Sequence, residues 1–410
     1  MKIKPYQSSL VKIWNKSANF LPSRLIASEI SVDDILKTAQ QRTQKKIIEN
    51  ISFIEPLTKL VSAINETGNL HSFGRFYVKQ MLLALVVNRL QLETLWDRHP
   101  EILEISIKKP IFILGLPRTG TSFLFNLLAL DPNHRYLTNW ETTASQCPPP
   151  GKYTFANDPR RKQGRFMLRF QHYLAPSMEK IHQFYLDGPE ECTPLLFQEF
   201  TTLALASLFD VPAYSDWLNN QSHAKTYEHH KRILQTLQWK YPNNRWLLKS
   251  PAHIEGINDI INVYPDACFI HMHRDPTQSL PSYASLSATF RGIYSVSLNY
   301  EKIGQQVLDR LVTDMDLFIE RKNNIKHLSS IDLQYKDLVS EPVKTIKKVY
   351  SRFDLPFSDH LEEKLHVFLA SKKGTKQTHN YDLESFGYSK EKIRQRFSKY
   401  LQHFSVQIED

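Results

Sequence analysis

A glycine- and hydroxyl-rich segment, Gly-Leu-Pro-Arg-Thr-Gly-Thr-Ser at 115–122, follows the apolar run 110–114. Its glycine spacing matches the loop that binds nucleoside triphosphates, G-x-x-x-x-G-K-[ST], although Thr121 stands where that loop has its lysine. Glycines let the backbone curl, so that successive amides can point at an anion on a helix N-terminus. The segment therefore predicts an oxyanion cradle, and a tight turn without a ligand is the alternative. Its expected donors are Arg118, Thr119, Gly120, Thr121 and Ser122.

Short apolar runs alternate with helix-like segments from residue 109 onward, and this alternation sets the surroundings of the loop. The runs that predict strands are 110–116, 134–138, 245–251, 267–274 and 331–338. Such alternation indicates an α/β fold, here a P-loop-like parallel sheet flanked by helices. Because ligands of parallel sheets bind at the carboxyl ends of the strands, the segment at 115–122 is expected to lie at the ligand edge.

The first hundred residues differ from the rest of the chain because they read as helices. The stretch 73–96 has the three- and four-residue apolar spacing of a well-buried helix. We expect an N-terminal helical region at 1–105 and an α/β domain at 106–410. A long helical insertion at about 142–244 leaves the sheet on its ligand side, and it is expected to form an acceptor lid. Plain helical packing is the alternative for this insertion.

The glycine-rich loop resembles the 5′-phosphosulfate loop of sulfotransferases. Cytosolic members of that family carry P-K-S-G-T-T where this chain has Pro-Arg-Thr-Gly-Thr-Ser at 117–122. The resemblance covers about 109–400, and the stretch 381–400 is similar to the C-terminal part of bacterial sulfotransferase-family proteins. It implies 3′-phosphoadenosine 5′-phosphosulfate (PAPS) as the sulfuryl donor. No metal ion is required, because a sulfonate carries less charge than a γ-phosphoryl group.

A second motif of the family is an arginine at the end of a strand with a serine eight residues later, which together hold the 3′-phosphate of the cofactor. Arg274 and Ser282 have this spacing. A hydroxyl two turns along a helix can approach the same phosphate as an arginine at the strand end. Ser279 and Ser285 are near enough to be alternatives, and Arg274 could instead pair with Asp275.

Two further matches are weaker. Tyr335, in Leu-Gln-Tyr-Lys-Asp-Leu, resembles the tyrosine that contacts the adenine in this family, with a core tyrosine as the alternative. Lys373 and Gly374 match the centre of the cofactor-gripping loop R-K-G-x-x-G, whose first arginine is Lys372 here and whose last glycine is Gln377. A solvated basic loop is the alternative for this stretch.

The catalytic base of cytosolic sulfotransferases is the histidine of a strand-ending K-T-H, and this chain departs from that pattern. It has Lys249 followed by Ser-Pro-Ala-His, so that Pro251 occupies the position of the histidine and His253 comes two residues later. Proline has no group that can take a proton, which leaves His253 as a substitute by geometry. The resemblance implies that Lys249 reaches the sulfonate or the bridging oxygen.

Acidic residues offer other bases. In tyrosylprotein and heparan sulfotransferases a glutamate just after the second strand is the base, and Glu141 matches it as the favoured candidate, since it follows the run 134–138. Glu190 and Glu191 are further candidates, with helix N-terminal charge as their alternative explanation. A carboxylate can serve if burial and nearby cations adjust its pKa. Arg118, which never deprotonates, suits the charge on the leaving group.

The charge balance favours anionic ligands or surfaces. Among 410 residues there are 52 Lys and Arg against 42 Asp and Glu, a formal net charge of +10. No motif with interleaved basic and aromatic residues occurs, so a nucleic acid partner is not expected. The basic cluster at 160–166 could grip a sulfated or phosphorylated acceptor or make a peripheral membrane contact, but a solvated face is favoured.

A cytoplasmic location is expected from three features. The stretch 1–14 has no apolar core followed by a cleavage site, and the apolar run 81–87 is too short to span a bilayer. The three cysteines are odd in number and far apart, which favours a reducing compartment.

The sequence therefore predicts a PAPS-dependent sulfotransferase that acts on a hydroxyl or amine of a small-molecule, lipid or carbohydrate acceptor. A P-loop kinase or phosphotransferase remains an alternative, because Asp275 lies near the end of a strand where a magnesium ligand could stand. A nucleotide-binding module without turnover is the other alternative. The sulfotransferase is preferred because Arg274 and Ser282 accompany the loop in the family's order.

Overall fold

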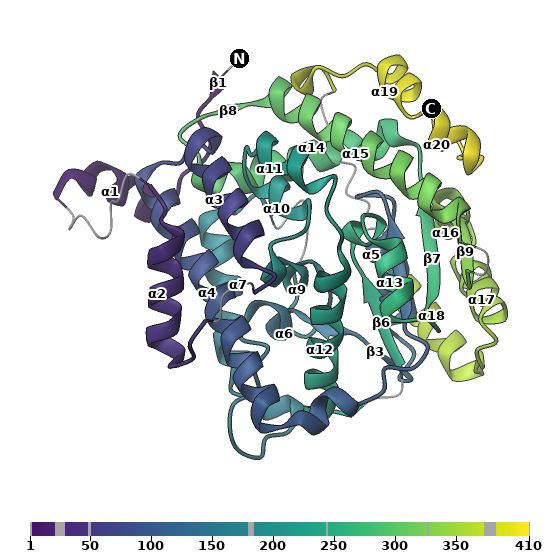
Figure 1. Ribbon diagram of the computed structural model, residues 1–410. Helices are drawn as coiled ribbons and strands as arrows, with labels where there is room; N and C mark the ends of the chain where they lie inside the picture. Colours follow the sequence, from purple (N-terminus) through teal and green to yellow (C-terminus); the bar gives the residue numbers. More distant parts are fainter. Residues whose placement is uncertain are drawn as a thin grey trace.

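The computed structural model describes residues 2–20, 29–47, 51–178, 184–242, 245–325, 328–372 and 383–409. Its centre is a five-stranded sheet with the order β3-β6-β2-β7-β9, in which every neighbouring pair of strands is parallel (Figure 1). The strands are β2 (Ile111–Gly115), β3 (His134–Arg135), β6 (Arg245–Lys249), β7 (Cys268–His273) and β9 (Ser330–Gln334). The expected α/β fold with a P-loop-like parallel sheet is confirmed.

All five expected strands end before their apolar runs do, and the runs 134–138 and 331–338 differ most from the strands observed. In the run 134–138 only β3 joins the sheet, whereas β4 (Leu137–Thr138) pairs antiparallel with β5 (Pro189–Glu190). The run 331–338 stops being a strand at the end of β9, where α16 (Tyr335–Ser340) begins. Both departures occur at the carboxyl edge of the sheet.

Helices cover both faces of the sheet. Phe112 and Leu114 of β2 face a core built with α12, α13, α14 and α15, whereas Ile111 and Ile113 face a core built with α5, α17 and α18. A strand that is buried on both faces needs no polar positions, which explains the continuous apolar run 110–114. The bounds of these helices are α5 Thr121–Leu128, α12 Ala224–Lys240, α13 Ile257–Val263, α14 Pro276–Tyr294, α15 Tyr300–Asn323, α17 Pro342–Arg352 and α18 Asp359–Lys372.

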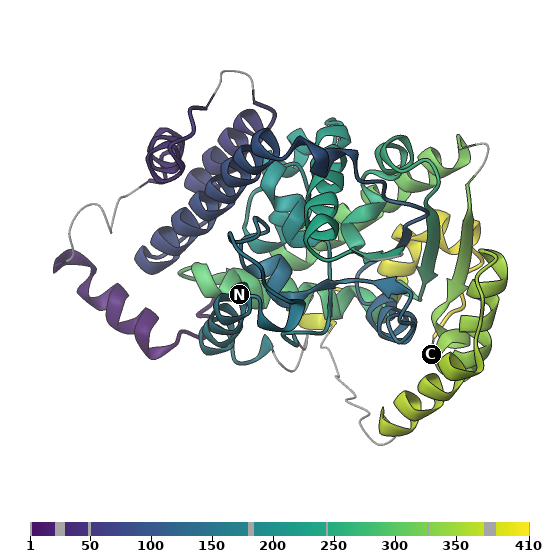
Figure 2. The same ribbon diagram turned by 90° about the horizontal axis from the view of Figure 1, so that it is seen from below.

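The N-terminal helices lie at the left of Figures 1 and 2, on the side of the molecule away from α17 and α18. They are α1 (Ser9–Ser17), α2 (Val32–Thr43), α3 (Ile54–Thr67) and α4 (Ser72–Arg98). Leu82 and Val86 of α4 share one apolar core with Phe200, Leu205 and Tyr214 of the insertion. The two helical regions are thus packed together, while the expected boundary at residue 105 stays a prediction.

The insertion and the residues just before it contribute further helices. They are α6 (Asn139–Thr143), α7 (Arg160–Leu174), α9 (Thr193–Leu196), α10 (Ala204–Leu208) and α11 (Pro212–Leu218), followed by α12. In the expected basic cluster, Arg160 is buried in an ion pair with Asp158, so this arginine is not part of a solvated face. Within the ranges given above, no helix combines the length and the apolar character needed to span a lipid bilayer.

Candidate active site

The loop that follows β2 has left-handed backbone at three positions. The φ angles are 148° at Gly115, 66° at Arg118 and 90° at Gly120. A Cβ atom on Gly115 would lie 2.6 Å from the carbonyl oxygen of Met272, and one on Gly120 would lie 2.7 Å from Cδ2 of Tyr335. Glycine is therefore required at both positions. Arg118 holds this conformation without being glycine, which is typical of strained ligand-binding turns.

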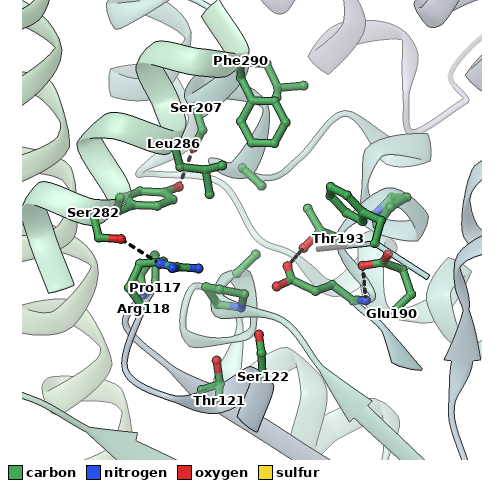
Figure 3. Close-up of a pocket in the computed structure, with 18 of the residues that line it drawn as sticks. Pro117, Arg118, Thr121, Ser122, Glu190, Thr193, Ser207, Ser282, Leu286 and Phe290 are labelled. Carbon is green, nitrogen blue, oxygen red and sulfur yellow. Dashed lines mark hydrogen bonds between the residues drawn. The ribbon is translucent and has the colours of Figure 1, made fainter. Parts of the chain in front are cut away.

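The first turn of α5 completes a cradle. Gly120 is the N-cap and Thr121 the first helical residue, so the unpaired amides of this turn face the loop. Thr121 and Ser122 line a cavity, and Figure 3 shows both hydroxyls at its floor. Thr119 differs from them because its hydroxyl donates to the carbonyl of Leu116 at 2.7 Å and is buried within the loop. Thr119 thus fixes the shape of the cradle.

Arg274 and Ser282, which are eight residues apart, both contact Arg118 of this loop. Ser282 Oγ accepts a hydrogen bond from Arg118 Nε at 2.9 Å (Figure 3), and an Nη of Arg274 donates to the carbonyl of Arg118 at 3.3 Å. The guanidinium of Arg274 lies 3.9 Å from the centroid of the Tyr335 ring. Residues from the ends of β2, β7 and β9 therefore converge at the carboxyl edge of the sheet.

The alternatives to this pair are placed elsewhere. Ser282 lines the cavity, whereas Ser279 and Ser285 are not among the described residues that line it. Asp275 caps α14 by accepting from the backbone of Thr277 at 2.9 Å, and its other oxygen accepts from Arg394 at 3.0 Å. The carboxylate that a magnesium-dependent kinase would need at this place is thus committed to the fold.

Arg274 is already hydrogen-bonded to a carboxylate from the segment 405–409. Arg274 donates from Nε and from an Nη to the two carboxylate oxygens of Glu409, at 2.9 Å and 3.2 Å. The segment is held in place because Lys336 Nζ donates to the carbonyl of Ile408 at 2.6 Å and the backbone amide of Glu409 donates to Asp275 at 3.0 Å. The cation expected to bind a phosphate is therefore paired with an internal anion.

Two glutamates, Glu190 and Glu191, line the cavity. Figure 3 shows Glu190 on the side of the site opposite Arg118 and Ser282. Glu190 is 7% exposed, and one of its oxygens accepts from Asn139 Nδ2 at 3.0 Å. Burial raises the pKa of Glu190 above its ordinary value, although the hydrogen bonds oppose the shift. A cavity-facing carboxylate with a raised pKa can accept a proton near neutral pH.

Glu191 has a different partner from its neighbour. It forms an ion pair with Lys249 Nζ and accepts from the hydroxyl of Thr193 at 3.0 Å. Lys249 also donates to Ser122 Oγ at 3.1 Å, so the lysine bridges the acid and the cradle. Lys249 itself is buried and is not among the described residues that line the cavity, so its expected contact with the transferred group stays a prediction.

The structure does not bring Glu141, the favoured candidate for the base, to the cavity. Its side chain is fully buried, one oxygen pairs with Arg135, and the other accepts from the backbone amide and hydroxyl of Thr138 at 3.1 Å and 2.9 Å. These contacts form a capping box at the start of α6. Glu141 is absent from the described residues that line the cavity, and its oxygens are committed to holding a helix.

The second candidate, His253, is also placed away from the cavity lining formed by the described residues. It is fully buried in the short turn Pro251–Ile254, where its Nδ1 lies 3.0 Å from the hydroxyl of Tyr227. Burial lowers the pKa of His253 well below its ordinary value, so that the ring is neutral. Lys373 and Gly374, expected in a cofactor-gripping loop, lie outside the described residues.

The sequence profile of the sulfotransferase family matches residues 110–359. The chain belongs to the sulfotransferase family. The omega-hydroxy-beta-dihydromenaquinone-9 sulfotransferases Stf3 of Mycobacterium bovis and Mycobacterium tuberculosis are each 26% identical to it over 280 residues, which are 67% of this chain and 70% of theirs.

Two solved structures are similar over almost the whole chain. Sulfotransferase STF1 from Mycobacterium tuberculosis is 27% identical with a TM-score of 0.79, covering 91% of this chain and 100% of that one. Sulfotransferase STF9 from Mycobacterium avium is 27% identical with a TM-score of 0.81, covering 93% and 98%. The present protein is thus a transferase with the sulfotransferase fold.

The cavity of this sulfotransferase has a volume of about 1050 Å³ and an apolar end beyond the polar walls. Side chains from α4, α7, α10 and α14 line that end, among them Met81, Leu174, Leu208, Leu286, Phe290 and Ile293. Helices of the N-terminal region and of the insertion therefore line the cavity. A lid role for the insertion stays a prediction.

Two contributions to the site were not foreseen from the sequence. Glu409 lies 135 positions from Arg274, so no local spacing signals their contact. Ser207, Tyr283 and Arg310 place polar groups in the apolar end. The one available signal is that Tyr283 directly follows Ser282 in a helix that already carries a site residue.

Proposed function

We propose that this sulfotransferase takes its sulfuryl group from PAPS and transfers it to a hydroxyl or amine of a small-molecule or lipid acceptor. The observation that carries the proposal is the convergence of Arg118, Ser282, Arg274 and Tyr335 on one glycine-rich loop. A nucleotide with phosphates at both its 5′ and 3′ positions needs an oxyanion cradle, a second cationic site and a surface for its base.

The residues fit such a nucleotide. We assign the amides at the start of α5, with Arg118, Thr121 and Ser122, to the 5′-phosphosulfate. Arg274 and Ser282 are assigned to the 3′-phosphate, and Tyr335 to the adenine. A side chain at position 120 would collide with the tyrosine ring, so the glycine keeps the cradle open. PAPS, when bound, supplies an activated sulfuryl group whose leaving group is the 5′-phosphate.

Glu190 is our candidate for the base in place of Glu141. It faces the cavity and has a raised pKa, which suits removal of a proton from an acceptor hydroxyl or amine. Arg118 and Lys249 offset negative charge that develops on the bridging oxygen. Glu191 holds Lys249 beside Ser122, so we assign it a positioning role.

The acceptor is proposed to be largely apolar. The wall of the apolar end of the cavity includes Met81, Leu208, Leu286 and Phe290. Binding a hydrocarbon part of the acceptor there would remove apolar surface from water and so stabilise the complex. The relative Stf3 is named for an omega-hydroxy-beta-dihydromenaquinone-9, a hydroxylated molecule, and this supports a lipid-like acceptor with a hydroxyl group.

The donor assignment can be tested by thermal unfolding with two nucleotides. We expect 3′,5′-ADP without Mg²⁺ to stabilise the protein, by about 2.7 kcal/mol at a hundredfold excess over its Kd. ATP with Mg²⁺ should give no stabilisation. The reverse pattern would contradict the proposal and favour a P-loop kinase. Arg274→Ala should weaken 3′,5′-ADP at least tenfold and leave AMP unchanged, because only the former carries the phosphate assigned to Arg274.

The transfer itself can be tested with ³⁵S-labelled PAPS and pools of lipids, carbohydrates and small molecules. We expect label in the lipid-soluble pool with the unchanged protein and none with Arg118→Ala. Binding of 3′,5′-ADP without transfer to any pool would favour a nucleotide-binding module without turnover.

A further inference from the structure

A polar group interrupts the apolar end of the cavity. Ser207 on α10, Tyr283 on α14 and Arg310 on α15 all line the cavity. Leu286 and Phe290 line it as well, and Figure 3 shows both on the same side of the site as Ser207. Nothing in the proposed roles of the cradle, Lys249 or Glu190 uses these three polar side chains.

The three side chains are bonded to one another. The hydroxyls of Ser207 and Tyr283, called here the hydroxyl pair, lie 2.6 Å apart (Figure 3). Arg310 donates to Ser207 Oγ at 2.8 Å and to the hydroxyl of Tyr283 at 3.0 Å, and it also donates to the carbonyl of Leu203 at 2.9 Å. Both hydroxyl-bearing residues are at least nine-tenths buried.

A count of hydrogens shows that the hydroxyl pair has a donor left over. Each hydroxyl carries one hydrogen, and each oxygen already accepts from Arg310. One of the two hydrogens forms the bond within the pair. The other has no acceptor among the described residues, whichever of Ser207 and Tyr283 is the donor. Because both residues line the cavity, this donor is available to a ligand.

Arg310 decides which kind of ligand atom suits this donor. A cation that donates to both oxygens makes the hydroxyl hydrogens better donors and the oxygens poorer acceptors. Asp314 lies 3.4 Å from Nε of Arg310 and offsets its charge, so a full anion is not needed at the pair. A neutral oxygen that only accepts, as in a carbonyl group, is the best match. In apolar surroundings an unmatched donor is costly, which makes such a site selective.

We propose that the hydroxyl pair is a second subsite for the acceptor, which takes a carbonyl oxygen of the same molecule whose hydroxyl or amine is sulfated. The inference rests on the proposed function in treating the apolar end as the acceptor site. The acceptor class is thereby narrowed to apolar molecules that carry a carbonyl oxygen as well as the reacting group.

Equilibrium dialysis with two probes of the same shape tests the subsite. The probes are 2-acetylnaphthalene and 2-isopropenylnaphthalene, which differ in having a carbonyl oxygen or a CH₂ group at one position. We expect the unchanged protein to bind the ketone about tenfold more tightly, as a hydrogen bond to a charge-assisted donor predicts. Equal binding of the two probes would overturn the proposal.

A variant at Leu286 tests whether the preference for the ketone arises at the hydroxyl pair. Leu286 is one helical turn from Tyr283, so Leu286→Gln brings an internal carbonyl within reach of the free donor. We expect the preference for the ketone to fall to twofold or less, while the matched Leu286→Met keeps it. If Leu286→Gln retains the full preference, the ketone binds elsewhere and the proposal fails.

An infrared measurement keeps the test independent of any variant. The carbonyl stretch of ¹³C-labelled 2-acetylnaphthalene should lie at lower wavenumber in the complex than in cyclohexane. A band at the same wavenumber as in cyclohexane would overturn the proposal. None of these measurements contains PAPS or needs turnover. A failure of sulfuryl transfer would therefore contradict the proposed function alone, and equal binding of the probes would contradict this inference alone.

Discussion

At the scale of single residues, Glu190 and Glu141 are both buried carboxylates. They differ in their hydrogen-bond and ion-pair partners, and these partners indicate different roles. Glu141 has a cation and a helix N-terminus around it, and both of its oxygens serve the fold. Glu190 accepts from Asn139 and from the backbone amide of Glu191, but it also faces the cavity. A carboxylate with no cation bonded to it keeps a higher proton affinity, as a base requires.

We expect Glu190→Gln to lower kcat by about 10²–10⁴, the usual range for loss of a general base. The affinity for 3′,5′-ADP should stay within twofold, since Glu190 lies on the wall across from the nucleotide residues. Steady-state kinetics and nucleotide titration measure the two quantities. Glu141→Gln is the matched control. It should lower the free energy of unfolding and have little effect on kcat. A large kcat loss in Glu141→Gln alone would restore it as the base.

The pH dependence of kcat/KM gives a second prediction for Glu190. A base is active when deprotonated, so activity is lost as the pH falls through its pKa. Burial raises the pKa of Glu190 above its ordinary 4.5, and the acidic limb should therefore lie above pH 4.5. This limb should vanish in Glu190→Gln when residual activity is measured. An acidic limb at or below pH 4.5 would show that another group takes the proton.

At the scale of elements, the cradle depends on a glycine at position 120, where a left-handed φ coincides with a close neighbour. We expect Gly120→Ala to weaken 3′,5′-ADP more than tenfold, because the added Cβ combines a φ of 90° with a 2.7 Å overlap on Tyr335. Gly387→Ala is a matched control, with a φ of 70° but its nearest neighbouring atom at 3.8 Å. It should lose about 1–2 kcal/mol of stability from strain alone and keep nucleotide affinity. Similar affinities in both variants would argue against the cradle.

The segment 405–409 brings Glu409 to Arg274. In the proposed assignment of Arg274, an arriving 3′-phosphate displaces this carboxylate. We therefore expect Glu409→Gln to bind 3′,5′-ADP about tenfold more tightly, equivalent to about 1.4 kcal/mol, with AMP unchanged. Isothermal titration measures both, and the exposed Glu341→Gln is the control. Weaker binding of 3′,5′-ADP would instead mean that Glu409 orients Arg274.

Local sequence patterns predicted the strands and the helix that carry the cradle. They did not predict the tertiary contacts between side chains at the site. The apolar runs located β2, β6 and β7, because strand patterns are local, while the shared phosphate of Arg274 and Ser282 stays a prediction. The place of Glu141 after a strand favours it as the base. Its contact with Arg135 depends on the shape of the intervening turn, and residue spacing in the sequence does not determine that shape. Tertiary packing alone brings Glu409 to its partner.

At the scale of the whole molecule, a buried ion pair connects the N-terminal helices to the insertion. An Nη of Arg89 of α4 lies 3.0 Å from a carboxylate oxygen of Glu199 in an ion pair, and both side chains are at most 8% exposed. Arg89 also lies 2.9 Å from Nδ1 of His229, and Ser52 donates to the other oxygen of Glu199 at 2.6 Å. Burial raises the pKa of Glu199, so its charge depends on the arginine. The pair joins the region before residue 105 to the rest of the fold.

This connection predicts that the two regions unfold together. We expect Arg89→Met to lower the free energy of unfolding by about 3–5 kcal/mol, because it leaves the Glu199 charge buried without its partner. The double variant Arg89→Met/Glu199→Gln should recover most of that loss. Lys45→Met, which breaks an exposed pair with Asp97, should cost at most about 1 kcal/mol. Urea unfolding followed by circular dichroism and tryptophan fluorescence should give one transition for every variant. A separate early transition in Arg89→Met would instead mean that residues 1–105 fold as a domain of their own, and that the apolar end of the cavity is closed by a contact between domains.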